Sequence, residues 1–314
     1  MTDPFASSGI WLKTQLHCHT TNSDGDGAPA DLFARYEAAG YDVVAITDHW
    51  FLTDVASTER TIAIPGAELN AALPGRPRGM HVTSIGVAEL PEDPAVLGAH
   101  AFPDPASAAR WIGERGGLAF VAHPVWSGLD HRTVLDAEDF TGIEIFNAVC
   151  EGLNGRGNAG TIWDQVLEAG GSTFGIATDD AHNHKLDVDR AWTWVRAEER
   201  SPAAVLAALR AGSFYASAGP RILEARRENG HIVVRCTPAR AAILRTRWEA
   251  GATVWGEPRP RAFSGEALEV DGDGLITAAR LEWEHADLPF LRVIVRDAAG
   301  LEAWTNPLEA FQSG

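Results

Sequence analysis

The sequence is poor in basic residues. It holds 26 lysines and arginines against 43 aspartates and glutamates, which gives a formal net charge of -17 at pH 7. Most of this excess falls before Ile222, in a segment whose only lysines are Lys13 and Lys185. Extended nucleic acid is recognised through a broad positive face, so the composition argues against that class of partner. Bound divalent cations would offset part of the negative charge.

Cysteines and long hydrophobic runs are also scarce. The three cysteines, Cys18, Cys150 and Cys236, are odd in number and widely spaced, so neither a disulfide framework nor a zinc ribbon is predicted. No stretch reaches the roughly 18 apolar residues of a membrane span. The N-terminus lacks a basic segment followed by an apolar run. We therefore expect a protein without membrane association that works in the cytoplasm.

Hydrophobic periodicity predicts strands that alternate with helices before Ile222. Polar residues stand where successive strands end. This alternation predicts parallel βα units, and the polar strand ends predict a barrel whose rim converges on one point. The helices are expected at 29–39, 106–115, 161–169 and 202–211, and the strands at 41–47, 62–67, 80–87, 118–122, 142–146 and 172–177.

The pattern changes at Ile222. Asn229-Gly230 separates two β-type segments, 224–228 and 231–236, which is a strong signal for a two-residue hairpin. Further turns follow at 271–274 and 298–300 without a convincing helix, so we predict a small antiparallel β-sandwich. A length of 314 residues also exceeds the size at which single cores stop growing. We expect two domains, residues 1–221 and 222–314.

Side chains that can bind metal end or follow most of the predicted strands. His17 and His19 are two residues apart and point to one face of an extended segment, and Asp180 and His182 repeat this spacing. Imidazole nitrogens and carboxylate oxygens suit Zn, Fe and Mn. One such histidine is usually structural, but the recurrence predicts a divalent metal site. The candidate ligands are His17, His19, Asp24, His49, Glu68, His81, His123, Asp180 and His182.

Two further carboxylates are candidates for supporting roles. Glu144 lies inside a predicted strand and is expected to point into the barrel behind the ligands. Asp48 precedes His49 and is expected to orient a ligand imidazole, because metal-bound histidines usually need a partner on their second nitrogen.

The succession LHCHTTNSDG, ITDH, GAEL, a later histidine, AHP and TDDAH closely resembles the PHP family, the polymerase and histidinol phosphatase metallohydrolases, over about residues 14–220. The segments IEIFNAVCEGLNGRGNAGTIWDQVLEAG, GIATDDAH and ALRAGSFYASAGP look like the branch that includes carbaryl hydrolase-like proteins. The resemblance implies a distorted (β/α)7 barrel, so that the expected fold is α/β, with the β-sandwich following the barrel.

The same resemblance implies an assignment of two to three divalent ions. One ion would be held by His17, His19, Glu68 and Asp180. Glu68 would bridge to a second ion held by His81 and His123. A third would be held by Asp24, His49 and His182. Asp24 stands where the histidinol phosphatases have a histidine, so two ions and three ions both stay open.

The activity implied is that of a metal-dependent hydrolase, most simply a phosphoesterase in which a metal-bridging hydroxide attacks the substrate. A carbamate or carboxylic ester needs the same nucleophile and is the alternative. A non-catalytic metal-binding or interaction module is a second alternative. His182 and Asp24 are expected to protonate or stabilise the leaving group.

Two residues are predicted to contact a small, anionic substrate. Asn147 ends a strand, and Arg156 lies in the glycine-flanked segment 152–160, which is expected to form a loop over the same rim. A guanidinium can bind two phosphate oxygens at once. Pairing of Arg156 with a surface carboxylate such as Glu151 is the competing interpretation.

Overall fold

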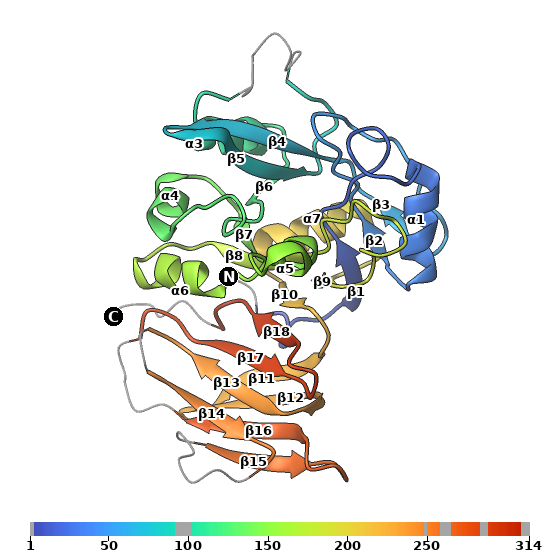
Figure 1. Ribbon diagram of the computed structural model, residues 1–314. Helices are drawn as coiled ribbons and strands as arrows, with labels where there is room; N and C mark the ends of the chain where they lie inside the picture. Colours follow the sequence, from blue (N-terminus) through green and yellow to red (C-terminus); the bar gives the residue numbers. More distant parts are fainter. Residues whose placement is uncertain (1–2, 92–101, 248–249, 258–264, 283–287, 309–314) are drawn as a thin grey trace.

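The computed structural model describes residues 3–91, 102–247, 250–257, 265–282 and 288–308. These residues form a mixed α/β structure with three β-sheets and short helices (Figure 1). None of the described helices combines the length and apolarity needed to cross a membrane. The helices are α1 (Pro29–Ala38), α3 (Pro105–Glu114), α4 (His131–Asp136), α5 (Ala148–Asn154), α6 (Gly160–Glu168) and α7 (Pro202–Ala211).

The largest sheet has nine strands and runs through both halves of the chain. The three strands that come first in the sequence pair in parallel, whereas the other pairings are antiparallel. In spatial order the strands are β14 (Gly251–Trp255), β13 (Ala241–Arg245), β17 (Arg292–Arg296), β18 (Glu302–Thr305), β10 (Phe214–Ser217), β9 (Trp192–Ala197), β1 (Ile10–Gln15), β2 (Val43–Val44) and β3 (Ile62–Ala63).

A second sheet has five strands and is only partly parallel. The β6–β7 and β7–β8 pairs are parallel, but β5 is antiparallel to both β4 and β6. Pro74-Gly75 explains the first reversal, because Gly75 has a φ of 71° and lies between the paired residues Leu73 and Arg76. The strands are β4 (Gly66–Leu73), β5 (Arg76–Ile85), β6 (Leu118–Val121), β7 (Gly142–Asn147) and β8 (Phe174–Thr178).

The predicted (β/α)7 barrel is not confirmed. Single bridges, Cys18 with Ala181 and His49 with Glu68, connect the two sheets where a barrel would need continuous pairing. The antiparallel β5 also breaks the expected run of parallel βα units. What the prediction has right is the mixed α/β class and the order of most strands and helices.

Local sequence signals set the helix ends well. Helices α1, α3 and α7 each begin with proline, whose missing N–H and fixed φ suit the first helical position. Ser201 caps α7 by accepting a hydrogen bond from the Ala204 N–H, and Gly212 ends it with a φ of 73°. Helix α7 therefore has the predicted bounds, and it buries Val205 and Leu209 in the core.

The C-terminal part is antiparallel throughout its described residues. Asn229 and Gly230 have φ values of 48° and 83°, as a tight hairpin turn between β11 and β12 requires. One apolar core lies between this sheet and the C-terminal strands of the nine-stranded sheet, and it includes Val234, Leu281 and Val293. The four strands, in spatial order, are β11 (Ile222–Glu228), β12 (His231–Ala239), β16 (Ile276–Glu282) and β15 (Gly265–Val270).

The two predicted domains share structure. Strand β10, before residue 222, pairs with β18, so the nine-stranded sheet crosses the expected boundary (Figure 1). Asn306 accepts a hydrogen bond from the Gly175 N–H and donates to the carbonyls of Gly212 and Phe214. Trp304 and Phe290 also join the core cluster built around β6 and β7. The division at residues 221 and 222 therefore stays a prediction.

Candidate metal centre

All nine predicted ligands lie together at one end of the five-stranded sheet, next to the segment that follows β1. Their nitrogen and oxygen atoms form four overlapping groups in which every pair of ligand atoms is within 4.8 Å. The groups are His19, Asp24, His49 and His182; His17, Glu68 and His123; His17, His19 and Asp180; and His49, Glu68 and His81. The convergence expected from the strand ends is therefore present in the structure.

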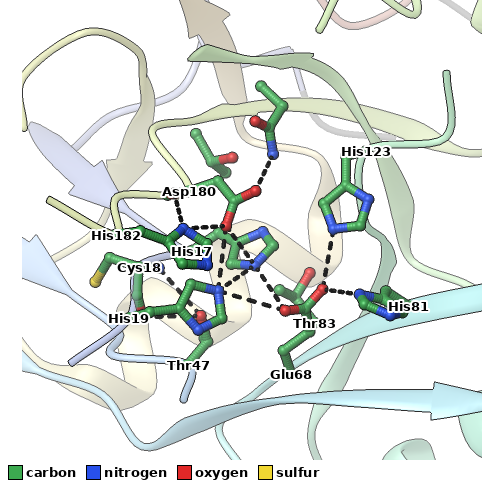
Figure 2. A network of polar contacts seen from close by, with 12 residues as sticks. His17, Cys18, His19, Thr47, Glu68, His81, Thr83, His123, Asp180 and His182 are labelled. Atoms are coloured by element: carbon green, nitrogen blue, oxygen red, sulfur yellow. Dashed lines mark hydrogen bonds and ion pairs between the residues drawn. The ribbon is translucent and has the colours of Figure 1, made fainter. Parts of the chain in front are cut away.

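Glu68 lies at the centre of these groups and is 1% exposed. Figure 2 shows its carboxylate between imidazoles that come from both sheets. The nitrogen-to-oxygen distances are 2.8 Å to His81, 3.1 Å to His123, 3.2 Å to His49, 3.3 Å to His17 and 3.4 Å to His19. A carboxylate with two oxygens in this position can bridge two cations.

The β4–β5 hairpin explains why Glu68 and His81 meet. Glu68 is paired with Thr83, and His81 lies two residues from Thr83 on the same strand. Side chains two apart on a strand share a face, so His81 and Glu68 project to one side as diagonal neighbours. The antiparallel β5 that breaks the predicted barrel thus also brings His81 to the site.

The most buried group joins the segment after β1 to the segment after β8. His19 N–H donates to the Ala181 carbonyl at 2.8 Å, and Asp180 N–H donates to the His17 carbonyl at 3.0 Å. The Nε2 atoms of His17 and His19 are 3.1 Å apart, and Asp180 Oδ1 lies 3.2 and 3.1 Å from them (Figure 2).

Asp180 Oδ1 is buried and has no hydrogen-bond partner in the described structure. Such an atom is costly unless a cation satisfies it. Two facing imidazole nitrogens beside that oxygen supply the donor set that Zn, Fe or Mn prefers. The residues present therefore fit a divalent ion at this position.

The group of His19, Asp24, His49 and His182 is more open to solvent than the others. The side chains of Asp24, His49 and His182 are 54%, 32% and 34% exposed, and Asp24 Oδ2 lies 3.5 and 3.4 Å from the two Nε2 atoms. Gly25 lets the turn that carries Asp24 pass close to the chain, because a Cβ there would lie 2.3 Å from the His19 carbonyl oxygen. This group faces the cavity described below.

Glu144 has the supporting role that its position in a strand predicts. It is fully buried, and its carboxylate accepts hydrogen bonds from His17 Nδ1 at 2.6 Å, the His123 N–H at 2.7 Å and the Thr178 hydroxyl at 2.8 Å. The bond to Nδ1 leaves His17 Nε2 facing the cluster, as a metal-binding imidazole requires. Thr178 had no predicted role.

Asp48 acts differently from the prediction. Its carboxylate accepts from the N–H and hydroxyl of Thr20 and from the hydroxyls of Ser23 and Thr53. None of these partners is an imidazole. Asp48 therefore braces the turn after His19 and reaches that histidine only through Ser23, whose Oγ lies 3.4 Å from His19 Nδ1.

Asn147 is buried behind the ligands and does not line the cavity. Its amide nitrogen donates to Glu144 and Asp180, and its side-chain oxygen accepts from the Cys150 N–H at the start of α5. These bonds occupy the amide, so the structure gives no support to the predicted substrate contact. It supports a role in fixing Asp180.

Two side chains that the sequence did not single out organise the backbone here. Gln15 Oε1 accepts from the N–H groups of Leu16, His17 and Asp179. Asp179 accepts from the N–H groups at 189–191 and from the Tyr36 hydroxyl, so it holds the segment after His182 in place. Burial raises the pKa of Asp179 to about 7, although these hydrogen bonds oppose the rise.

The ionisable groups of the cluster shift one another strongly. Burial lowers the pKa of a histidine, but Asp180, Glu144 and Glu68 together raise the pKa of His17 well above its usual value. Burial acts in the same direction on His19, where the adjacent carboxylates of Asp180 and Glu68 prevail and raise the pKa to about 9. Burial raises the pKa of Glu68, but the surrounding histidines lower it by more, so that the pKa lies well below its usual value. Because metal-binding imidazoles must be neutral, a divalent ion bound here would displace protons from these histidines.

The backbone is strained at the ligands. His123 and Asp180 have φ values of 27° and 56°, and Trp50, which follows His49, has a φ of 53°. Residues with a side chain rarely adopt this region, and strain of this kind gathers at functional sites.

A cavity of about 1180 Å³ opens onto the cluster. Seven of the candidate ligands line it: Asp24, His49, Glu68, His81, His123, Asp180 and His182. Arg190 also lines it, whereas Arg156, the predicted anion contact, does not. Arg156 is exposed just beyond the C-terminal end of α5, and anion binding by this residue stays a prediction.

Replacing Glu144 with glutamine is expected to weaken divalent metal binding by about 10–100-fold, because His17 would lose its charged partner. Competition with a chromogenic chelator measures this change. Glu266→Gln alters a surface carboxylate that pairs with Arg280 and is the matched control. Equal metal affinity in Glu144→Gln and the control would contradict the role given to Glu144.

No family model matches the chain. Over 79 residues it is 35% identical to the 5′-3′ exoribonuclease of Haemophilus influenzae, and this match takes in 23% of the chain but only 28% of that protein. The chain thus spans little more than a quarter of this curated relative.

Solved structures are similar over more of the chain. A two-domain protein from Bacteroides vulgatus that contains a predicted PHP-like metal-dependent phosphoesterase is 17% identical, with 95% of both chains covered and a TM-score of 0.49. An amidohydrolase from Chromobacterium violaceum is 16% identical, with 56% of this chain and 89% of that chain covered and a TM-score of 0.40. Both structures are similar to this chain at low identity, and the motifs of the sequence remain the ground for the resemblance to the PHP family.

Proposed function

We propose that this chain is a divalent-metal-dependent hydrolase of the PHP type, with phosphoric esters as the first class of substrate. The observation that carries this proposal is the convergence of five imidazoles, three of them buried, on the buried Glu68 carboxylate, beside an Asp180 oxygen that accepts no hydrogen bond in the described structure. Buried donors of this kind, open on one side to a large cavity, are typical of a catalytic metal site.

The assignment of ligands follows the geometry. His17, His19 and Asp180 would hold one ion, with Glu68 bridging to a second beside His81 and His123. Asp24, His49 and His182, with His19 nearby, would hold a third. When bound, such ions supply Lewis acidity and make water nucleophilic at neutral pH.

The protein's own residues then position the metal ligands and handle the proton of the leaving group. Glu144 and Asn147 fix His17 and Asp180, while the exposed group meets the substrate. One water is consumed: its oxygen bonds to phosphorus, the bond from phosphorus to the leaving oxygen breaks, and the proton that the water gives up ends on that oxygen. His182 and Asp24 both line the cavity. Where they hold no third ion, His182 is placed to pass this proton to the leaving oxygen, and the Asp24 carboxylate, 3.4 Å from His182 Nε2, to stabilise the charged imidazole.

Hydrolysis of a carbamate or carboxylic ester is the second candidate. The observation that favours it is the scarcity of cations in the lining of the cavity, where Arg190 is the one described lysine or arginine. A neutral ester would not need more. The same residues would serve, with attack at a carbonyl carbon instead of phosphorus.

Metal content and a substrate screen test the proposal together. Protein purified without chelator should hold about two to three Zn, Mn or Fe ions per chain by elemental analysis. The screen compares phosphomonoesters, phosphodiesters, aryl esters and carbamates. Fewer than one ion per chain, with no hydrolysis after metal is added, would overturn the proposal. Full metal content without hydrolysis would favour a non-catalytic metal-binding module.

A further inference from the structure

The cavity has an apolar side that the metal cluster does not explain. Leu153 of α5, Leu186 of the segment after His182 and Leu301 of the β17–β18 turn all line it. These side chains are 67%, 65% and 45% exposed. Three leucines from three separate elements, left open around one cavity, indicate a binding surface. We refer to them as the leucine clamp.

Leu301 is held in place firmly. Its N–H donates to Asp297 Oδ1, and its carbonyl accepts from the Asp297 N–H at 2.9 Å, which closes the turn. Its side chain packs on Gly219, where a Cβ would come within 3.0 Å of it. The C-terminal part of the chain therefore presents one apolar side chain to the cavity from a turn that backbone hydrogen bonds close.

Aromatic side chains also line the cavity. Phe146 of β7 lines the cavity and stacks on Trp304 of β18, with ring centroids 5.5 Å apart. Trp126 and Trp192 also line the cavity. A cavity of this size lined by aromatic and leucine side chains can accommodate an alkyl or aryl group.

The charged side chains that line the cavity further restrict the class of ligand that it can bind. Asp26, Glu151, Asp187 and Asp189 line the cavity without belonging to the candidate metal groups, whereas Arg190 is the single lysine or arginine among the described lining residues. Carboxylates repel the phosphates of a nucleotide or nucleic acid. A substrate that extends from the metal ligands toward the clamp should therefore be apolar along its length.

We propose that the leucine clamp binds an alkyl or aryl group of the substrate, so that the protein prefers esters with a bulky apolar substituent over small or polyanionic ones. This inference rests on the proposed function for the placement of the reacting ester at the metal ligands. It assigns to Leu301 a role in specificity, which makes the C-terminal part a contributor to the substrate site.

The test measures binding of two non-hydrolysable probes by isothermal titration calorimetry on the metal-loaded protein. Phenylphosphonate should bind about tenfold or more tightly than methylphosphonate, because burial of the ring adds to the shared phosphonate contact. Leu301→Ala and Leu153→Ala should each reduce this ratio by about threefold or more. Leu223→Ala, which alters a leucine on β11 that is 53% exposed and outside the cavity lining, is the matched control.

A second probe separates the clamp from the chemistry. 4-tert-Butylphenol is uncharged and is offered to chelator-treated protein, in which no metal ion can hold its oxygen. The clamp should still bind it, and Leu301→Ala should weaken that binding. Binding of this phenol without hydrolysis of any ester would sink the proposed function and leave the clamp standing. A phenyl-to-methyl ratio near one, or equal ratios in Leu301→Ala and Leu223→Ala, would overturn the clamp.

Discussion

Glu68→Gln is expected to lower kcat/KM by about a thousandfold or more, which corresponds to roughly 4 kcal/mol of transition-state stabilisation. The carboxylate faces five imidazoles, and in the proposed function it would bridge two ions. Glutamine has the same shape but offers a neutral oxygen and an N–H₂ donor, which cannot bridge cations. Steady-state kinetics on an ester found in the screen and elemental analysis of the same sample measure the effect.

Glu269→Gln is the control for that variant, because it removes the same charge from a surface pair with Arg235. Metal content and turnover should be unchanged in it. Glu68→Gln should lose at least about one ion per chain together with its activity. Full turnover with full metal content in Glu68→Gln would remove Glu68 from the bridging position.

Asp164→Ala is expected to reduce the free energy of unfolding by about 3–5 kcal/mol. Asp164 of α6 accepts from Nε and Nη2 of Arg292 at 2.7 and 2.6 Å, and Arg292 is 1% exposed beneath the ring of Trp163. Without Asp164 a buried guanidinium would lose its counter-charge. Chemical denaturation measures the loss, and a fall in Tm of about 10 °C should accompany it.

Arg245 provides the comparison within the same cluster. It also pairs with Asp164, at 3.0 Å, but its side chain is 43% exposed. Arg245→Ala should therefore cost no more than about 1 kcal/mol. The double variant Asp164→Leu with Arg292→Met should recover much of the loss, because no buried charge remains. If Asp164→Ala is as stable as Arg245→Ala, the buried pair does not join the two parts of the chain in the way described.

The sequence predicts the composition of the site better than the shape of the sheets. Seven of the nine ligands follow the end of a strand, whereas Glu68 and His81 lie inside β4 and β5, and the spacing of His17 to His19 brings both rings to one face. These local features are independent of strand direction. The convergence could therefore be predicted although the (β/α)7 barrel is not confirmed.

Strand direction could not be read from hydrophobic runs. A buried strand has the same composition whether its neighbour is parallel or antiparallel, so the reversal at β5 stayed hidden. Pro74-Gly75 was the available signal, since a proline and glycine pair between two apolar runs indicates a tight turn. The short helix α5 was likewise missed, because Gly152 and Gly155 made the segment resemble a loop.

Long-range packing was also beyond the sequence. Nothing in the spacing of Leu301 relates it to Gly219 or to a cavity formed by residues near 150 and 186. The role of Asp48 was misjudged for a similar reason, since three nearby hydroxyl groups compete for its oxygens more effectively than an imidazole does.

The nine-stranded sheet has a mechanical consequence. Two domains joined by a linker can rotate about a hinge, but here β18 is hydrogen-bonded to β10, and β10 to β9, so rotation would require backbone hydrogen bonds to break. The part that carries Leu301 is thus coupled rigidly to the part that carries the histidines. Entry of a ligand into the cavity therefore does not depend on rotation of one part of the chain against the other.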